Sequence, residues 1–293
     1  MKKILVYISP EKYSSLFDLI LGYDAGADVV VPYSDTSDQD IRDVVYSCVY
    51  TRGSSGRKNT AIFIGGPDVN KGEEFMSAIL KIFGELPPEF RVSVVADPHG
   101  AHTTSSACAV KIKDALGSLK GLSATILAGT GPVGQSIAII LAREGCRVKI
   151  TSRKLEKAKK VCRIIKEKYK VDAMPFEAKD DRTIEKAVSD ADIVVATGPE
   201  KITLLPQRIW TKYPRIKVLA DVNAVPPYGI EGIDPRDDRK KTVDGRTTIG
   251  ALSIGSLKIR AHHRMVEKLF EEKGQILDLW KIYEITQAIS EKP

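Results

Sequence analysis

Three glycines that directly follow an apolar run constrain the fold of this chain more than any other feature. The run 124–128 has the pattern of a buried strand, and the segment Gly129-Thr130-Gly131-Pro132-Val133-Gly134 follows it with G-x-G-x-x-G spacing. The first glycine permits a tight turn, the second lets backbone N–H groups approach a pyrophosphate, and the third lets the next helix pack on its strand. That helix adds unsatisfied donors and a positive dipole end. These six residues predict a Rossmann-type dinucleotide site.

The second apolar run predicts which dinucleotide binds. Residues 147–150 lie about 20 residues beyond the glycines, where an acidic side chain would bind an NAD ribose. Here the run ends in Thr151-Ser152-Arg153-Lys154. A carboxylate would repel a 2′-phosphate, whereas donors and positive charge bind it. We therefore expect NADP as the cofactor, and the remaining residues expected to bind it are Ser152, Arg153, Lys154, Lys157, Thr197 and Asn223.

Length and composition indicate an ordinary enzyme-sized globular chain. Its 293 residues suit about two domains, and 43% hydrophobic with 28% charged residues allows a sizeable core. The N-terminal apolar run is closed by Ser9 and Pro10, so it has the pattern of a first strand and not of a signal peptide or membrane segment. The cysteines have no metal or redox spacing, which predicts reduced thiols in a cytoplasmic protein without a metal. They are Cys48, Cys108, Cys146 and Cys162.

A net charge of +7 raises the question of nucleic acid as a partner. The basic residues are mostly interleaved with acidic ones. The densest basic segment, 153–170, surrounds an apolar stripe and therefore predicts a helix with one solvated face. Tyr169 is its only aromatic residue that could stack on a base. We expect no nucleic-acid partner.

Strand and helix patterns alternate along the chain and predict an α/β fold. The expected strands are 3–8, 28–32, 60–65, 91–96, 124–128, 147–150, 173–176, 193–196 and 217–221, and the expected helices of the first part are 13–21, 38–49, 73–83 and 103–116. This rhythm is typical of a Rossmann-type doubly wound parallel sheet plus a second α/β substrate domain. We expect a substrate domain at 1–116 and an NADP domain at 117–265, with C-terminal helices 266–293 packing back on the first.

Sequence blocks that run in one order over almost the whole chain suggest a family. They are Phe17-Asp18, Gly22-Tyr23-Asp24, Tyr50-Thr51-Arg52-Gly53, Ala61-Ile62-Phe63-Ile64-Gly65-Gly66, His102-Thr103-Thr104, Leu127 to Gly134, Arg153-Lys154-Leu155, Ala220-Asp221-Val222-Asn223-Ala224, Pro226-Pro227, Gly229-Ile230, Gly250-Ala251-Leu252 and Leu257-Lys258. In these blocks the chain resembles the NADP-dependent methylene-tetrahydromethanopterin dehydrogenases. Ordered blocks over both domains are more specific than the glycine motif alone.

The resemblance implies an activity and several site residues. Members of this family transfer a hydride reversibly from methylene-tetrahydromethanopterin, or from its tetrahydrofolate analogue, to NADP and form the methenyl pterin of one-carbon metabolism. By resemblance, Lys258 is the catalytic residue, and Phe17, Tyr23 and Thr104 lie near the pterin. A homo-oligomer, trimeric or larger, is implied in the same way.

The chemistry of this reaction needs neither a catalytic triad nor a metal. The reacting carbon lies between two nitrogens whose lone pairs stabilise the cation left by the hydride, so the enzyme must mainly orient that carbon. Carboxylates would favour the developing cation and a bare ammonium would oppose it. Asp24, Asp97 and Asp221 are the acidic candidates, although each is equally a capping or turn carboxylate. Lys258 is therefore expected to orient a polar edge of the pterin.

Three histidines need separate treatment. His102 stands where the family has an amide side chain, and it is kept as a candidate substrate contact. This departure leaves the fine substrate preference open. The pair His262-His263 has no metal-ligand partner at useful spacing and is expected on the surface.

Alternative functions remain open. A Tyr-x-x-x-Lys pair of the related cyclohydrolases is missing, because the tyrosine at 46 is followed by another tyrosine at 50. A shikimate-dehydrogenase-like NADP oxidoreductase would need a Lys/Asp pair for proton transfer. A non-catalytic NADP-binding sensor would not need Phe17, Tyr23, Thr104 or Lys258.

Overall fold

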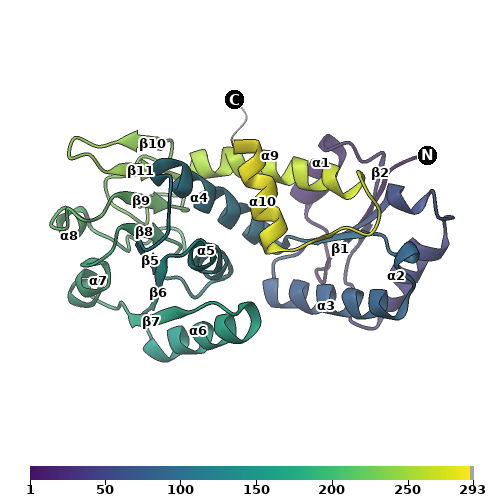
Figure 1. Ribbon diagram of the computed structural model, residues 1–293, viewed down its shortest axis with the longest axis horizontal. Coiled ribbons are helices and arrows are strands. Elements are labelled where there is room, and N and C mark those ends of the chain that lie inside the picture. Colours follow the sequence, from purple (N-terminus) through teal and green to yellow (C-terminus); the bar gives the residue numbers. More distant parts are fainter. Residues whose placement is uncertain (291–293) are drawn as a thin grey trace. The chain divides into compact units, whose positions relative to one another are not determined.

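The computed structural model describes residues 1–290 and divides into two compact units (Figure 1). Among the described residues, unit 1 contains Met1–Thr103 and 259–290, and unit 2 contains Thr104–Lys258. Each unit has its own sheet, in which most strands are parallel and alternate along the chain with helices; β10 (Asp238–Lys241) of unit 2 pairs antiparallel with β11 (Thr247–Ile249). The predicted α/β fold class is confirmed.

The sheet of unit 1 is entirely parallel. Its strands, in the order β12-β4-β3-β1-β2, are β12 (Ile276–Leu277), β4 (Ser93–Ala96), β3 (Thr60–Ile64), β1 (Ile4–Ile8) and β2 (Val29–Tyr33). The helices of this unit are α1 (Leu16–Asp24), α2 (Asp40–Tyr50), α3 (Val69–Glu85) and α10 (Leu279–Ser290), with short 3-10 turns η1 (Arg57–Asn59), η2 (Pro88–Phe90) and η3 (Pro98–Gly100). Strand order reverses between β1 and β3, and ligands bind beyond the carboxyl ends of strands at such a point.

Two apolar layers cover the sheet of unit 1. On one face, Ile41 and Val45 of α2 and Phe75 and Ile79 of α3 pack against strand residues such as Ile62. The other face is covered by α1, α10 and the C-terminal part of α9 (Ala251–Leu269), through a cluster that includes Leu5, Phe63, Met265, Leu269 and Ile282. The sheet is thus buried on both faces, as parallel sheets are.

The sheet of unit 2 has the strand order of a Rossmann fold. In the order β10-β11-β9-β8-β5-β6-β7 its strands are β10 (Asp238–Lys241), β11 (Thr247–Ile249), β9 (Val218–Asp221), β8 (Ile193–Ala196), β5 (Ser123–Leu127), β6 (Arg147–Ser152) and β7 (Ala173–Glu177). Its further helices are α4 (Ala101–Leu116), α5 (Pro132–Arg143), α6 (Leu155–Tyr169), α7 (Asp181–Val188) and α8 (Gln207–Trp210). The order reverses between β5 and β8, so the glycine segment after β5 lies at the switch point.

The boundaries between the units differ from the expected ones. The chain divides within α4 at 103/104 and within α9 at 258/259, whereas the sequence pattern placed the boundaries at 116/117 and 265/266. Helix α4 runs without a glycine or proline, so nothing in the sequence marks a boundary inside it. β10, with the sequence DRKK, was also missed because all four of its residues are exposed and charged.

Three further findings concern the whole described chain. Between residues 1 and 290, no helix combines the length and apolar character needed to cross a membrane. Over the same range, no three His, Cys, Asp or Glu side chains gather as a metal site. The cysteines are free and buried, and burial raises the pKa of Cys48 to about 12, which keeps that thiol protonated.

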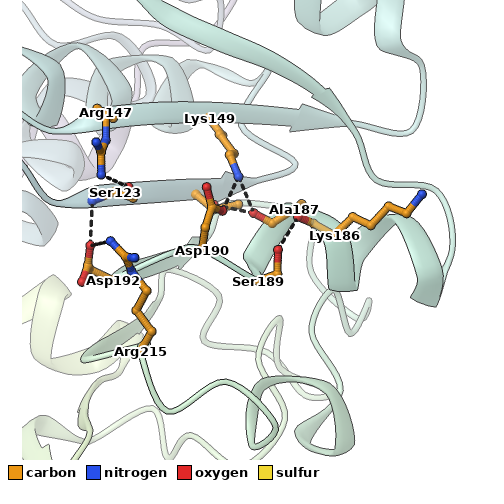
Figure 2. Close-up of polar contacts among 10 residues, drawn as sticks. Ser123, Arg147, Lys149, Lys186, Ala187, Ser189, Asp190, Asp192 and Arg215 are labelled. Carbon is orange, nitrogen blue, oxygen red and sulfur yellow. Dashed lines mark hydrogen bonds and ion pairs between the residues drawn. The ribbon is translucent and has the colours of Figure 1, made fainter.

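Asp192 directly precedes β8, at the end of the unit 2 sheet that lies opposite the glycine turn. Its side chain connects residues from several parts of this unit (Figure 2). Its carboxylate accepts the Ser123 N–H at 2.9 Å and pairs with Arg215 at 3.2 Å and Lys217 at 3.3 Å. Burial alone would raise the pKa of Asp192, but these hydrogen bonds and charges hold it below its ordinary value.

Asp192→Asn is expected to lower the free energy of unfolding by about 2 kcal/mol near neutral pH, because it removes a buried charge with several donors. The folded-state pKa is depressed, so the stabilisation is complete above the unfolded pKa of about 3.9 and is lost as the pH falls through the folded value. Urea titrations at neutral and at acidic pH measure both effects. Asp190→Asn is the matched control, because its exposed carboxylate pairs with Lys149 and should contribute under about 1 kcal/mol (Figure 2). Equal losses in the two variants would contradict the prediction.

Candidate functional site

The glycine segment forms a turn in which two positions have no room for a side chain. A Cβ added at Gly134 would lie 2.6 Å from both the Gly129 Cα and the Thr197 Oγ1, and one added at Gly129 would lie 2.9 Å from the Ile126 carbonyl oxygen. At Gly131, by contrast, an added Cβ would meet none of the described atoms within 4 Å. Gly129 and Gly134 therefore bring strand and helix together, while Gly131 leaves an open surface for a ligand.

Helix α5 begins at this open surface. Gly131 is its N-cap and Pro132 its first residue, and no side chain of the described residues caps it. The Gln135 amide closes the turn by donating to the Thr130 carbonyl at 2.9 Å. The remaining N–H groups of the first turn thus have no capping acceptor, which is the arrangement that binds phosphate.

The carboxyl end of β6 is fixed beside the glycine turn. β5 and β6 pair in parallel, and the Thr151 hydroxyl accepts the Ala128 N–H at 3.1 Å. Ser152 is buried, and its hydroxyl accepts the Lys154 N–H at 3.3 Å. The basic side chains that follow are therefore attached to a rigid strand end.

Three of these basic side chains are exposed and have no acidic partner. Arg153, Lys154 and Lys157 extend into solvent, and among residues 1–290 no carboxylate pairs with them. Lys159 of the same helix instead pairs with Glu156 at 2.8 Å. The charges of the first three are thus available to an anion, and the absence of a carboxylate at the end of β6 fits a 2′-phosphate better than a ribose hydroxyl.

Thr197 and Asn223, the other predicted nucleotide contacts, both have structural hydrogen bonds. The Thr197 hydroxyl donates to the Leu127 carbonyl at 3.0 Å and so fixes the end of β5. The Asn223 Oδ1 accepts the Val225 N–H at 2.9 Å, and its amide donates to the Pro227 carbonyl at 3.4 Å. Both residues shape the carboxyl edge of the sheet, and their contact with a nucleotide stays a prediction.

Asp221 is a turn carboxylate at the end of β9. It accepts the N–H groups of Asn223 at 3.0 Å and Ile230 at 2.8 Å, and a Cβ added at Gly229 would lie 2.9 Å from its Oδ1. Burial raises the pKa of Asp221 despite these donors, which lower it. The structure thus gives Asp221 the turn role that its sequence position allowed, and a direct substrate contact remains a prediction.

The switch point of the unit 1 sheet is built around a buried phenol. The Tyr7 hydroxyl donates to the Asp18 Oδ2 at 3.1 Å and accepts the Gly66 N–H at 3.1 Å. A Cβ added at Gly65 would lie 2.2 Å from the same hydroxyl. Burial, and then the Asp18 charge, raises the pKa of Tyr7, so the phenol stays a donor to the carboxylate.

Asp97 and His102 lie together at the end of β4. The Asp97 carboxylate is fully buried and accepts the N–H groups of His102 at 2.8 Å and Thr103 at 3.2 Å, as well as the Thr103 hydroxyl at 2.6 Å. The His102 Nδ1 lies 2.8 Å from the Ala96 carbonyl, so it carries the proton. Both predicted residues therefore organise the start of α4.

His262 corrects an expectation, because the prediction that it is a surface residue is wrong. It is fully buried, its ring stacks on Phe63 with centroids 5.2 Å apart, and it meets Phe17 edge-on at 6.3 Å. Its Nδ1 lies 3.8 Å from the Asp97 Oδ2. The signal was the helical period: His262 precedes the buried Met265 and Val266 by three and four residues, which places it on the apolar stripe of α9.

Helix α1 presents the predicted aromatic residues. It buries Asp18, Leu21 and Gly22 against the sheet, and it leaves Phe17 47% and Tyr23 50% exposed. The Phe17 ring therefore contacts His262 and is also open to a ligand. Asp24, the last residue of α1, is exposed as well.

Thr104 and Lys258 belong to unit 2. Thr104 lies on α4 and Lys258 on α9, and both are half-buried. Their substrate contacts stay predictions.

Comparison with known proteins finds family models that match parts of both units and relatives that align with almost the whole chain. Residues 16–99 match the family model described as methylene-tetrahydromethanopterin dehydrogenase, N-terminal, and residues 123–225 match the model described as NADP oxidoreductase, coenzyme F420-dependent. The chain is 38% identical to "Bifunctional protein MdtA" of Methylorubrum extorquens over 99% of both chains. It is 29% identical to the "NAD(P)-dependent methylenetetrahydromethanopterin dehydrogenase" of the same organism, again over 99% of both.

Solved structures of dehydrogenases share the fold. Shikimate 5-dehydrogenase from Listeria monocytogenes aligns with a TM-score of 0.53 and 16% identity, covering 97% of this chain and 96% of its own. At this identity the likeness extends to the fold alone.

Proposed function

Because the chain belongs to the methylene-tetrahydromethanopterin dehydrogenase family, we propose that it catalyses reversible hydride transfer from methylene-tetrahydromethanopterin to NADP. The family predicted from the sequence blocks is thereby confirmed, and with it an oxidoreductase that uses NADP. The single observation that carries the proposal is the basic end of β6, which is fixed to the glycine turn by the bond from the Ala128 N–H to Thr151.

The residues of unit 2 fit the cofactor. The open position at Gly131 and the first turn of α5 would hold the pyrophosphate, and Ser152, Arg153, Lys154 and Lys157 would hold the 2′-phosphate. When bound, NADP supplies the hydride-accepting ring. The protein itself supplies phosphate contacts and a rigid turn that fixes the orientation of its ligand.

The reaction requires positioning and electrostatics rather than proton transfer. One C–H bond of the methylene group breaks, both electrons leave with the hydrogen, and the carbon becomes a cation shared between its two nitrogens. The buried Asp97 carboxylate favours such a cation through its charge, and the half-exposed rings of Phe17 and Tyr23 provide a stacking surface for the pterin. Lys258 binds a polar edge of the pterin that is distant from the reacting carbon, and it thereby orients the pterin.

Finer features of the function are also proposed. Thr104 and His102 contribute polar contacts to substrate, and Asp24 and Asp221 add negative charge around it. The tetrahydrofolate analogue is the alternative substrate, because it shares the reacting ring region. The enzyme works in the cytoplasm as a homo-oligomer of three or more subunits.

The decisive experiment follows methenyl-pterin absorbance with each of the two methylene-pterins, with NADP and NAD in parallel. The proposal predicts turnover that is fastest with methylene-tetrahydromethanopterin and NADP. NADP binding without turnover of either pterin would refute it in favour of a sensor. Reduction of 3-dehydroshikimate would instead favour the shikimate-dehydrogenase-like alternative.

A further inference from the structure

Unit 1 contains a buried imidazole directly against the half-exposed Phe17 ring, and none of the expected reaction chemistry uses it. We propose that His262 is a positioning residue, which fixes the ring of Phe17 as the stacking surface for the pterin. This inference rests on the proposed function, because it assumes that Phe17 contacts the pterin.

The first step of the argument is that His262 is itself held in place. Its side chain is 1% exposed, and one ring face stacks on Phe63 at 5.2 Å with 25° between the planes. Phe63 lies in the middle of the sheet on β3 and is itself buried. The Asp97 carboxylate lies 3.8 Å from the His262 Nδ1. The imidazole thus has one orientation set by the sheet and by β4.

The second step is that Phe17 is not held by its own helix alone. Phe17 is the second residue of α1, and the residues that α1 buries against the sheet are Asp18, Leu21 and Gly22. With 47% of its surface exposed, the Phe17 side chain has solvent on one side. The nearly perpendicular contact with His262, at 88°, restricts the tilt of the Phe17 ring in the way that edge-to-face aromatic pairs do.

The third step is that the orientation of Phe17 matters for catalysis. A stacked pterin adopts the plane of the ring beneath it, and hydride transfer depends strongly on where the reacting carbon lies. Loss of the His262 contact should therefore weaken productive pterin binding and leave the cofactor site in unit 2 unchanged. A purely structural defect would instead lower the stability of the protein without weakening pterin binding more than NADP binding.

The test begins with His262→Leu, which removes the planar ring, and His262→Phe, which keeps one. His262→Leu should raise KM for methylene-tetrahydromethanopterin by about fivefold to tenfold, where tenfold corresponds to about 1.4 kcal/mol, with the Kd for NADP unchanged. His262→Phe should restore KM to within about twofold of the parent enzyme, because an aromatic pair is retained. Val266→Ala, one turn further along α9 and equally buried, is the matched control and should lower thermal stability without raising KM. A similar KM increase in this control would overturn the proposal.

A double-mutant cycle then tests whether His262 acts through Phe17. Phe17→Leu combined with His262→Leu should raise KM no further than Phe17→Leu alone. If the KM increases of the two single variants multiply in the double variant, the positioning role is overturned. It is also overturned if Phe17→Leu has a normal KM while His262→Leu has a raised KM.

A spectroscopic measurement separates this inference from the proposed function. With 4-fluorophenylalanine at position 17, the parent chain should give one sharp fluorine resonance, and His262→Leu should give a broadened or divided one. This result does not require turnover. An unchanged resonance would overturn the positioning role, whereas an ordered ring in a chain that turns over no pterin would refute the proposed function alone.

Discussion

Arg153→Ala combined with Lys154→Ala is expected to raise the Kd for NADP at least about 100-fold and to leave the Kd for NAD within about twofold. Each side chain would lose a charge-assisted contact worth about 1.5–3 kcal/mol, and every 1.4 kcal/mol is tenfold in affinity. Because Thr151 and not these residues binds the glycine turn, the site for the rest of the nucleotide should survive. Isothermal titration calorimetry with both nucleotides measures the difference.

A matched pair of lysines on α6, the helix that follows these two residues, controls for net charge. Lys159→Ala combined with Lys160→Ala removes the same amount of positive charge, and both side chains are exposed. NADP affinity should then change by less than about threefold, because screened charges at a distance act weakly. If the two double variants lose equal affinity for NADP, a general basic surface and not a local 2′-phosphate site is responsible.

Lys258→Ala is expected to reduce kcat about 100-fold or more while the Kd for NADP stays within about twofold. A displacement of the reacting carbon by about 1 Å is enough for such a loss. Steady-state rates with saturating methylene-tetrahydromethanopterin, combined with an NADP titration, separate the two quantities. Comparable turnover in the variant would reject the assigned role of Lys258.

Arg260→Ala provides the control on the same helix. Arg260 is exposed on α9, and its guanidinium donates to the Ile289 carbonyl at 2.7 Å. Its removal deletes a positive charge two residues from Lys258 and should leave kcat unchanged within about twofold. A large loss here as well would indicate that the contact between α9 and α10, rather than one ammonium group, determines turnover.

The glycine turn after β5 could be predicted from sequence because its constraints are local. Gly129 and Gly134 have no room for a Cβ, and the atoms that exclude it belong to neighbouring turns, to Thr197 or to Ile126. Strand, turn and helix therefore follow one another in the sequence as they do in space. The basic residues after β6 are predictable for the same reason, since parallel strands end at one edge of the sheet.

The roles of the buried polar residues could not be predicted in this way. Asp97 and Asp221 looked like two equivalent acidic candidates, yet each accepts backbone N–H groups from a following turn or helix start. Asp97 also approaches His262, more than 150 residues away in sequence, and no local pattern encodes that contact. The helical period places His262 on the apolar stripe of α9, but the rings that it meets there, Phe63 and Phe17, are set by tertiary packing.

At the end of β6, the residue that holds the glycine turn in place is different from the residues whose charges could bind a phosphate. The bond that keeps the glycine turn in place comes from one residue, and the charges available to a phosphate come from others two to six positions later. We therefore expect substitutions at Arg153, Lys154 and Lys157 to change coenzyme preference without loosening the turn. Efforts to convert the enzyme to NAD should leave Thr151 untouched and place an acidic side chain at the next exposed position.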